Sequence, residues 1–269
     1  MNGRPVLVGL PYDASSSFLR GAAEAPGRIR EALRSPAGNG WSEVTIDVAS
    51  SPQGLEDLGD LDLTEPVQAR ARIERAVAGL ADDDRRFIAL GGDHSVTYPI
   101  LRGLSRGRPD ITVLQIDAHP DLYDEFEGDR YSHACPFARI MEEGLAARLV
   151  QVGIRAMSGP QVSQAARFGV EQIDMRAWVD GARPSVAGDV YVSIDLDGLD
   201  PAFAPGVSHP EPGGLTTRDV LGIIQNLNGR LLGADIVELN PARDVAGLTA
   251  GVAAKFVKEL TGHFMADGL

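Results

Sequence analysis

The sequence has little cysteine and, near its start, no hydrophobic run long enough to cross a membrane. A single cysteine, Cys135, among 269 residues excludes an internal disulfide and a zinc site built on paired cysteines. The apolar run at residues 6–10 is too short for a signal peptide or a membrane span, and it ends at Pro11. We therefore expect a cytoplasmic protein with no membrane partner.

Basic residues are also scarce relative to acidic ones. The chain has 25 lysines and arginines against 38 aspartates and glutamates, a formal net charge of −13. This balance argues against a nucleic acid partner, whose phosphates would be repelled, and favours a cationic small-molecule substrate. A hydrophobic content of 43% with 31 glycines and 17 prolines is typical of a globular protein with many tight connections. The length suits one large core, so we predict a single domain over residues 1–269.

Short apolar runs, several rich in β-branched residues, alternate with predicted helices along the chain. Clear predicted strands lie at residues 87–90, 111–116, 189–194 and 231–239. A further strand is predicted at residues 44–48, followed by an acidic connection at residues 50–63. About eight strands alternating with helices predict an α/β fold with three layers, in which helices cover both faces of a mainly parallel sheet.

The stretch D-A-H-P-D at residues 117–121 directly follows the predicted strand 111–116. Its three side chains capable of binding metal occupy alternate positions, so they project from one side of an extended segment and can converge on a divalent cation. The alternative is that the two acids cap turns and His119 is an ordinary hydrogen-bonded histidine.

Other polar side chains also follow predicted strands. His94 comes after the strand 87–90, Asp195 and Asp197 follow the strand 189–194, and Glu238 lies near the end of the last strand. Because ligands bind at the carboxyl ends of parallel strands, we expect these side chains to meet at one edge of the sheet. Asp93, beside His94, is predicted to cap the next helix instead.

The four aspartates of this pattern would balance the charge of two divalent cations. They are Asp117, Asp121, Asp195 and Asp197. Carboxylate and imidazole ligands without thiolate suit Mn²⁺, with Zn²⁺, Fe²⁺, Co²⁺ and Ni²⁺ as alternatives. Two ions about 3.5 Å apart lower the pKa of a shared water enough to provide hydroxide near neutral pH, so the pattern predicts a hydrolase.

Four motifs resemble those of the ureohydrolases, the arginase and agmatinase family. They are G-G-D-H-S at 91–95, D-A-H-P-D at 117–121, S-I-D-L-D-G-L-D-P at 193–201 and D-I-V-E-L-N-P at 235–241. With P-Y-D near the N-terminus and P-G-G-L-T at 212–216, the resemblance spans nearly the whole chain. It implies a single α/β domain with two Mn²⁺ ions that hydrolyses a guanidino group to urea and an amine. It also implies a homo-oligomer, since relatives are often trimers or hexamers.

The resemblance further implies the role of each site residue. It assigns His94 and Asp121 to one metal ion, His119 and Asp197 to the other, and Asp117 and Asp195 to both as bridging ligands. Asp121 would also orient the metal-bridging hydroxide that attacks the guanidinium carbon. Glu238 would bind the guanidinium, and His133 would carry protons to the leaving amine.

The substrate prediction depends on the loop after the metal motif. Arginases carry an asparagine where this chain has Tyr123, and the loop 124–129 is acidic here. An acidic loop would repel a carboxylate and could attract a second amine. The stretch D-E-F-E-G-D-R-Y-S-H-A-C at 124–135 resembles the agmatinase-like branch of the family, so agmatine, cleaved to putrescine and urea, is the predicted substrate. Arginine, aminopropylagmatine, guanidinobutyrate and formimidoylglutamate remain alternatives, and Arg130 is available to pair with a substrate carboxylate. A deacetylase-like hydrolase and a non-catalytic metal-binding relative are more remote alternatives.

Overall fold

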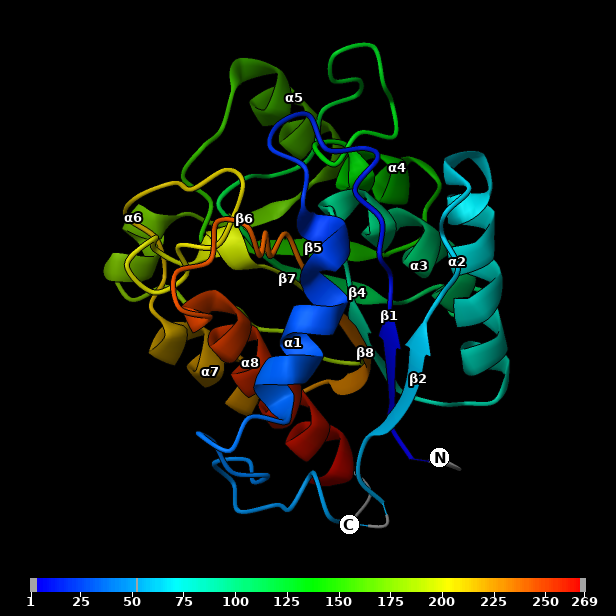
Figure 1. Ribbon diagram of the computed structural model, residues 1–269. Helices are drawn as coiled ribbons and strands as arrows, with labels where there is room; N and C mark the ends of the chain where they lie inside the picture. The colour runs from blue at the N-terminus through cyan, green and yellow to red at the C-terminus, as the bar shows by residue number, and fades with distance from the viewer. Residues whose placement is uncertain (1–3, 52, 267–269) are drawn as a thin grey trace.

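The structure, a computed structural model that describes residues 4–51 and 53–266, is built around one sheet of eight strands (Figure 1). In chain order the strands are β1 (Val6–Gly9), β2 (Glu56–Asp60), β3 (Phe87–Leu90), β4 (Thr112–Ile116), β5 (Arg148–Val152), β6 (Glu171–Ile173), β7 (Asp189–Asp195) and β8 (Arg230–Val237). Their order across the sheet is β2-β1-β3-β8-β7-β4-β5-β6, and every neighbouring pair is parallel. All carboxyl ends therefore lie along one edge of the sheet.

Helices cover both faces of the sheet, which confirms the predicted α/β fold. The α-helices are α1 (Ala25–Leu33), α2 (Pro66–Asp82), α3 (Thr97–Leu104), α4 (Pro136–Glu142), α5 (Gly159–Phe168), α6 (Met175–Val179), α7 (Thr217–Gln225) and α8 (Leu248–Ala266), with short 3-10 helices η1 (Ala22–Glu24), η2 (His94–Val96) and η3 (Leu196–Gly198). Helices α1, α7 and α8 pack together in one layer, and α2, α3 and α4 pack together in the other (Figure 1). Within the described residues, none of these helices has the length and apolar character needed to cross a bilayer.

Each face of the sheet has its own hydrophobic core. In β7, Val190, Val192 and Ile194 pack into the core that contains residues of α1, α7 and α8. Tyr191 points the other way, into the core that contains residues of α2, α3 and α4. Successive side chains of a strand alternate between faces, so a strand covered on both sides is apolar at nearly every position. This explains why the central strands were recognisable as short continuous apolar runs.

One predicted strand is wrong. Residues 44–48 form a turn in which Thr45 has a φ of 62°, and the strand lies instead at β2, inside the stretch 50–63 that was predicted to be a connection. The acidic sequence of β2 concealed it. Because β2 is an edge strand, its carboxylates can reach α1, where Arg30 bonds Asp57 at 2.9 Å.

The turn after β3 depends on glycine at position 92. A Cβ atom on Gly92 would overlap the carbonyl oxygen of Tyr12, so only glycine allows the backbone to pass this close. The next residue, Asp93, caps η2 by accepting a hydrogen bond from the Ser95 backbone at 3.1 Å, as predicted. The turn thereby places His94 over the carboxyl end of the sheet.

Candidate active site

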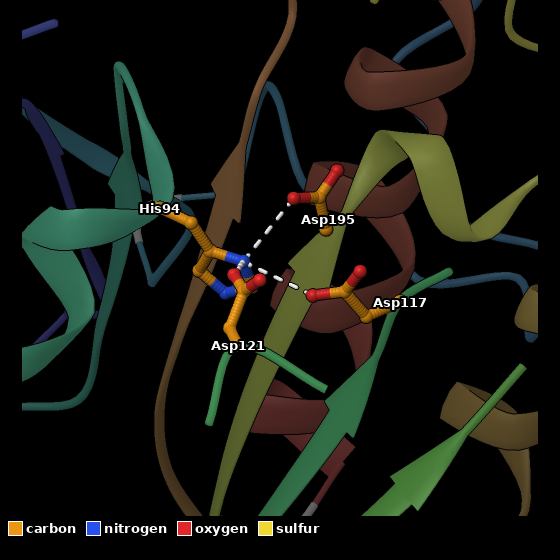
Figure 2. A group of neighbouring side chains, drawn as sticks. All are labelled: His94, Asp117, Asp121 and Asp195. Carbon is orange, nitrogen blue, oxygen red and sulfur yellow. Dashed lines mark ion pairs between the residues drawn. The ribbon is translucent and has the colours of Figure 1, made fainter. Parts of the chain in front are cut away.

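The ends of β3, β4 and β7 bring four predicted metal ligands together (Figure 2). Nδ1 of His94 lies 3.1 Å from a carboxylate oxygen of Asp117 and 3.0 Å from one of Asp121. A carboxylate oxygen of Asp195 lies 3.1 Å from the same nitrogen. All four side chains are buried, so this first cluster concentrates negative charge where little water can screen it.

The first cluster has the chemistry of a site for a divalent cation. Nδ1 of His94 is buried and has no hydrogen-bond partner among the described residues, although three carboxylates surround it. Burial, followed by the charges of Asp121 and Asp197, raises the pKa of Asp117 to about 7. A bound cation would accept the lone pair of the unpartnered His94 nitrogen. It would also keep the crowded carboxylates ionised, and so lower the raised pKa of Asp117.

A second cluster adjoins the first and is formed by Asp117, His119 and Asp197. Nδ1 of His119 lies 3.0 Å from Asp197 Oδ2 and 3.7 Å from Asp117 Oδ1. Burial lowers the pKa of His119, but the charge of Asp197 outweighs it and the pKa rises to about 11. Asp117 belongs to both clusters, as a bridging ligand would, whereas Asp195 belongs to the first cluster. The two clusters together contain all six predicted ligands.

Glu238, just after β8, and His133, just before α4, form a hydrogen-bonded pair beside the clusters. Glu238 Oε1 lies 3.0 Å from His133 Nδ1 and accepts a hydrogen bond from the His94 backbone at 2.9 Å. Burial lowers the pKa of His133, but the hydrogen bond and charge of Glu238 raise it to about 9. His133 therefore holds a proton at neutral pH next to the carboxylate predicted to bind a guanidinium.

Asp121 and Glu238 are held in an unusual backbone conformation. Their φ angles are 50° and 66°, in the left-handed region that residues other than glycine rarely adopt. Backbone bonds fix both residues: the Asp121 carbonyl accepts from Phe137 at 3.2 Å, and the Glu238 amide donates to Gly92 at 2.9 Å. Such strain is often found at functional sites, where the surrounding fold holds a side chain in a required direction.

A cavity of about 470 Å³ opens beside the clusters and contains Glu238 and His133 in its lining. Four residues of the two clusters also line it: His119, Asp121, Asp195 and Asp197. Its remaining lining is neutral or aromatic apart from Arg155, and consists of Ser17, Tyr123, Phe126, Ala134, Ala156, Met157, Ser158, Gln161 and His209. The charged inner end suits a polar reacting group, and the neutral outer wall suits the rest of a small substrate.

The acidic side chains of the loop 124–129 do not line the cavity, so the electrostatic argument for agmatine finds no support in the geometry. Tyr123 and Phe126 line the cavity, but none of the loop's acidic residues does. Asp124 is held by Arg130 at 2.7 Å and by Arg139 of α4 at 2.8 Å. These ion pairs also occupy Arg130, which is therefore not a free partner for a substrate carboxylate.

Two cavity residues, Ser17 and His209, were not predicted to have a role. Ser17 Oγ lies 2.9 Å from Nε2 of His133. The His209 ring centroid lies 5.1 Å from that of His133 and 6.3 Å from that of His119. In the sequence, His209 lies in a stretch rich in proline and glycine between two of the family motifs, and that position was the available signal. Burial and the neighbouring His133 lower the pKa of His209, which favours its neutral form.

Cys135, the single cysteine of the sequence, is a packed core residue. Its side chain is fully buried, and Sγ donates to the Asp129 carbonyl at 3.6 Å. Burial raises the pKa of the thiol to about 12, so it carries no thiolate at neutral pH.

Comparison with known proteins agrees with this geometry. The family model described as "Arginase family" matches residues 4–262. The chain is 47% identical over 274 residues to arginase 1, mitochondrial, of Oryza sativa subsp. indica, covering 95% of this chain and 80% of that protein. It is 35% identical over 261 residues to an N(1)-aminopropylagmatine ureohydrolase of Thermus thermophilus, covering 88% of this chain and 83% of that protein.

The fold matches a solved structure closely. Superposition on the arginase from Medicago truncatula gives a TM-score of 0.92 at 44% identity, covering 97% of this chain and 87% of that one. The same eight-stranded arrangement and the match over almost the whole chain make the assignment independent of any single motif. The chain therefore belongs to the arginase family, whose members are hydrolases of guanidino carbon–nitrogen bonds.

Proposed function

We propose that this chain hydrolyses the guanidino group of a small cationic substrate to urea and an amine, using two Mn²⁺ ions. The observation that carries the proposal is the position of the Glu238 carboxylate, which lines the same cavity as members of both metal clusters and bonds His133 at 3.0 Å. A buried carboxylate beside a metal-binding site matches a planar cation that must be held while one of its bonds is cleaved.

The metal part of the proposal follows from the donor set. His94, Asp117, Asp121 and Asp195 would hold one ion, and Asp117, His119 and Asp197 would hold the other. These ligands are oxygen and imidazole nitrogen, which suits Mn²⁺. When bound, the two ions lower the pKa of water and so supply hydroxide as the nucleophile at neutral pH.

Protein side chains would do the remaining work. The Glu238 carboxylate accepts hydrogen bonds from the guanidinium N–H groups and so aligns its carbon with the metal clusters. As the carbon–nitrogen bond to the amine breaks, the proton that His133 holds passes to the leaving nitrogen, which departs as the free amine. Ser17, at 2.9 Å from Nε2 of His133, keeps the ring oriented and connects it with the cavity mouth.

L-Arginine is the substrate we propose first. The rice and Medicago relatives are named arginases. The outer wall offers the neutral side chains Ser158 and Gln161, and Ser158 is the N-cap of α5. The positive end of a helix dipole favours a carboxylate, which is the group that distinguishes arginine from agmatine.

Agmatine, the substrate predicted from the sequence, is the second candidate. Among the described residues that line the cavity, Arg155 is the one arginine or lysine, and it donates to five backbone carbonyls. A carboxylate would therefore find no free guanidinium or ammonium partner, and agmatine has no carboxylate to pair. The Thermus relative, named for a larger guanidino amine, supports the same choice.

A cytoplasmic location and a homo-oligomer, trimer or hexamer, belong to the same proposal. The rice relative is named mitochondrial, so a mitochondrial location is the alternative. Light scattering of the purified chain over a range of concentrations tests the oligomer. Fractionation of the native cells tests the location.

The experiment that tests the function is urea release by Mn²⁺-loaded protein with arginine and agmatine at equal concentrations. We expect urea from arginine at the higher kcat/KM. A preference for agmatine would replace the first substrate by the second and keep the chemistry. No urea from these two, from aminopropylagmatine, or from guanidinobutyrate would overturn the proposal.

A further inference from the structure

A short hydrogen-bond chain leads from the first metal cluster into the core of the sheet. Nε2 of His94 lies 2.9 Å from Oγ of Ser193 on β7, and that oxygen lies 2.6 Å from Oδ1 of Asp235 on β8. All three side chains are fully buried. Ser193 and Asp235 are register partners in the sheet, so two rigid strands fix the geometry of the chain.

The directions of these hydrogen bonds fix how the His94 ring is held. An ionised carboxylate only accepts, so the Ser193 hydroxyl donates its hydrogen bond to Asp235. The serine oxygen then accepts a hydrogen bond from Nε2 of His94. Nδ1, on the other side of the ring, faces the carboxylates of Asp117, Asp121 and Asp195. A hydrogen bond from the outer nitrogen of a metal-binding histidine orients its ring toward the metal.

We propose that Ser193, with its hydroxyl directed by Asp235, is a positioning residue that holds the His94 ring with Nδ1 toward the first cluster. The role depends on the metal-dependent function proposed above. Without the serine hydroxyl, the ring loses the contact at Nε2 that fixes its orientation. The affinity of the first cluster for a divalent ion then falls.

Tyr191 offers a matched control, because it bonds the oxygen of Asp235 that Ser193 does not bond. Tyr191 donates to Asp235 Oδ2 at 2.8 Å, and Thr97 donates to the same oxygen at 2.8 Å. Tyr191→Phe therefore removes a buried hydrogen bond to the same carboxylate without touching Ser193 or His94. Any loss of metal affinity that comes only from a weakened core would appear in both variants.

The test measures Mn²⁺ binding to wild type, Ser193→Ala and Tyr191→Phe by calorimetry, with electron paramagnetic resonance to distinguish one bound ion from a coupled pair. We expect Ser193→Ala to weaken one of the two dissociation constants by about 10- to 100-fold, the usual effect of removing a partner of a metal-binding histidine. Tyr191→Phe should keep both constants within about threefold of wild type while lowering the melting temperature.

A further variant tests the hydroxyl itself. Ser193→Thr, which keeps the hydroxyl, should restore the wild-type Mn²⁺ affinity if the serine acts through its oxygen.

Three outcomes would overturn the inference. Equal Mn²⁺ affinity in Ser193→Ala and wild type would remove the positioning role, and so would an equal loss in Ser193→Ala and Tyr191→Phe. A Ser193→Thr variant that binds Mn²⁺ as weakly as Ser193→Ala would show that the hydroxyl is not the group that matters. If wild type itself bound no Mn²⁺ at either cluster, the proposed manganese dependence would fail as well, which separates that result from the others.

Discussion

Nδ1 of His133 and Oε1 of Glu238 lie 3.0 Å apart although 105 residues separate them in the chain. One atom comes from the loop before α4 and the other from the end of β8, so the contact exists only in the folded protein. Each group sets the state of the other: the carboxylate holds the proton on the imidazole, and the imidazolium helps to keep the carboxylate ionised. Several expected results follow from this pair and its surroundings.

Replacing Glu238 by glutamine should separate metal binding from turnover. Glu238→Gln removes the negative charge that faces a guanidinium but none of the six metal ligands. We expect a loss of urea release of at least about 100-fold, with the bound metal per chain unchanged. Activity assays with metal analysis of the same samples check this, and wild-type-like turnover would remove Glu238 from the mechanism.

The stability contributed by His133 should depend on pH. Its pKa is raised from 6.5 to about 9, so its contribution is fully present below pH 6.5 and is lost as pH rises through about 9. The shift corresponds to no more than about 3 kcal/mol. Unfolding free energies of metal-free wild type and His133→Gln, measured from pH 6 to 10, should converge on the alkaline side. A constant difference over that range would contradict the pKa.

Ser17 should affect the rate more than substrate binding. Ser17→Ala removes the hydroxyl that lies 2.9 Å from Nε2 of His133 and leaves the Glu238 contact intact. The loss of one such hydrogen bond, about 1 kcal/mol, predicts a kcat lower by about threefold to tenfold with little change in KM. Ser163→Ala is a suitable control, because that exposed hydroxyl bonds only the Gly159 carbonyl of its own helix. Equal kcat in Ser17→Ala and wild type would exclude the role.

Removal of metal should destabilise the fold. The buried carboxylates of both clusters repel one another, and a cation bound only in the native state stabilises it by mass action. Chelation should lower the melting temperature by about 5 °C or more, and added Mn²⁺ should restore it. Scanning calorimetry checks the result, and an unchanged melting temperature would show that the clusters bind no ion in the purified protein.

The turn after β3 should tolerate no side chain. In Gly92→Ala the new methyl group would overlap the Tyr12 carbonyl oxygen, so we expect a loss of about 3 kcal/mol or more in unfolding free energy. Gly79→Ala is the matched control, since a Cβ there meets no atom within 4 Å and lies in the interior of α2. That substitution should be neutral or stabilise by up to about 1 kcal/mol. Similar stability of the two variants would contradict the close approach.

The metal ligands were predictable because they follow apolar strands directly. Strands β3, β4 and β7 are buried on both faces, so their sequences were recognisable, and the parallel sheet brings their ends to one edge. Residues 56–60 were missed because an exposed edge strand has no apolar pattern. Acidic charge in this strand is balanced by Arg30 of α1.

The cavity wall was predicted less well, since it is made by loops. The sequence shows that residues 124–129 are acidic, but not that Arg139 of α4 holds Asp124 away from the cavity. It shows a serine-rich loop, but not that Ser17 reaches His133 across 116 residues. Which way a loop side chain points depends on contacts between distant segments, and no local pattern encodes those contacts.

The division between strand ends and loops has a consequence for how such a protein can change over evolutionary time. The six metal ligands are placed at or next to the ends of strands in the rigid sheet, whereas Tyr123, Phe126, Met157 and Ser158 of the outer wall lie in loops. Mutations in those loops can exchange one substrate tail for another while the reaction centre stays intact. One ancestral reaction could in this way give rise to enzymes for many different guanidino compounds.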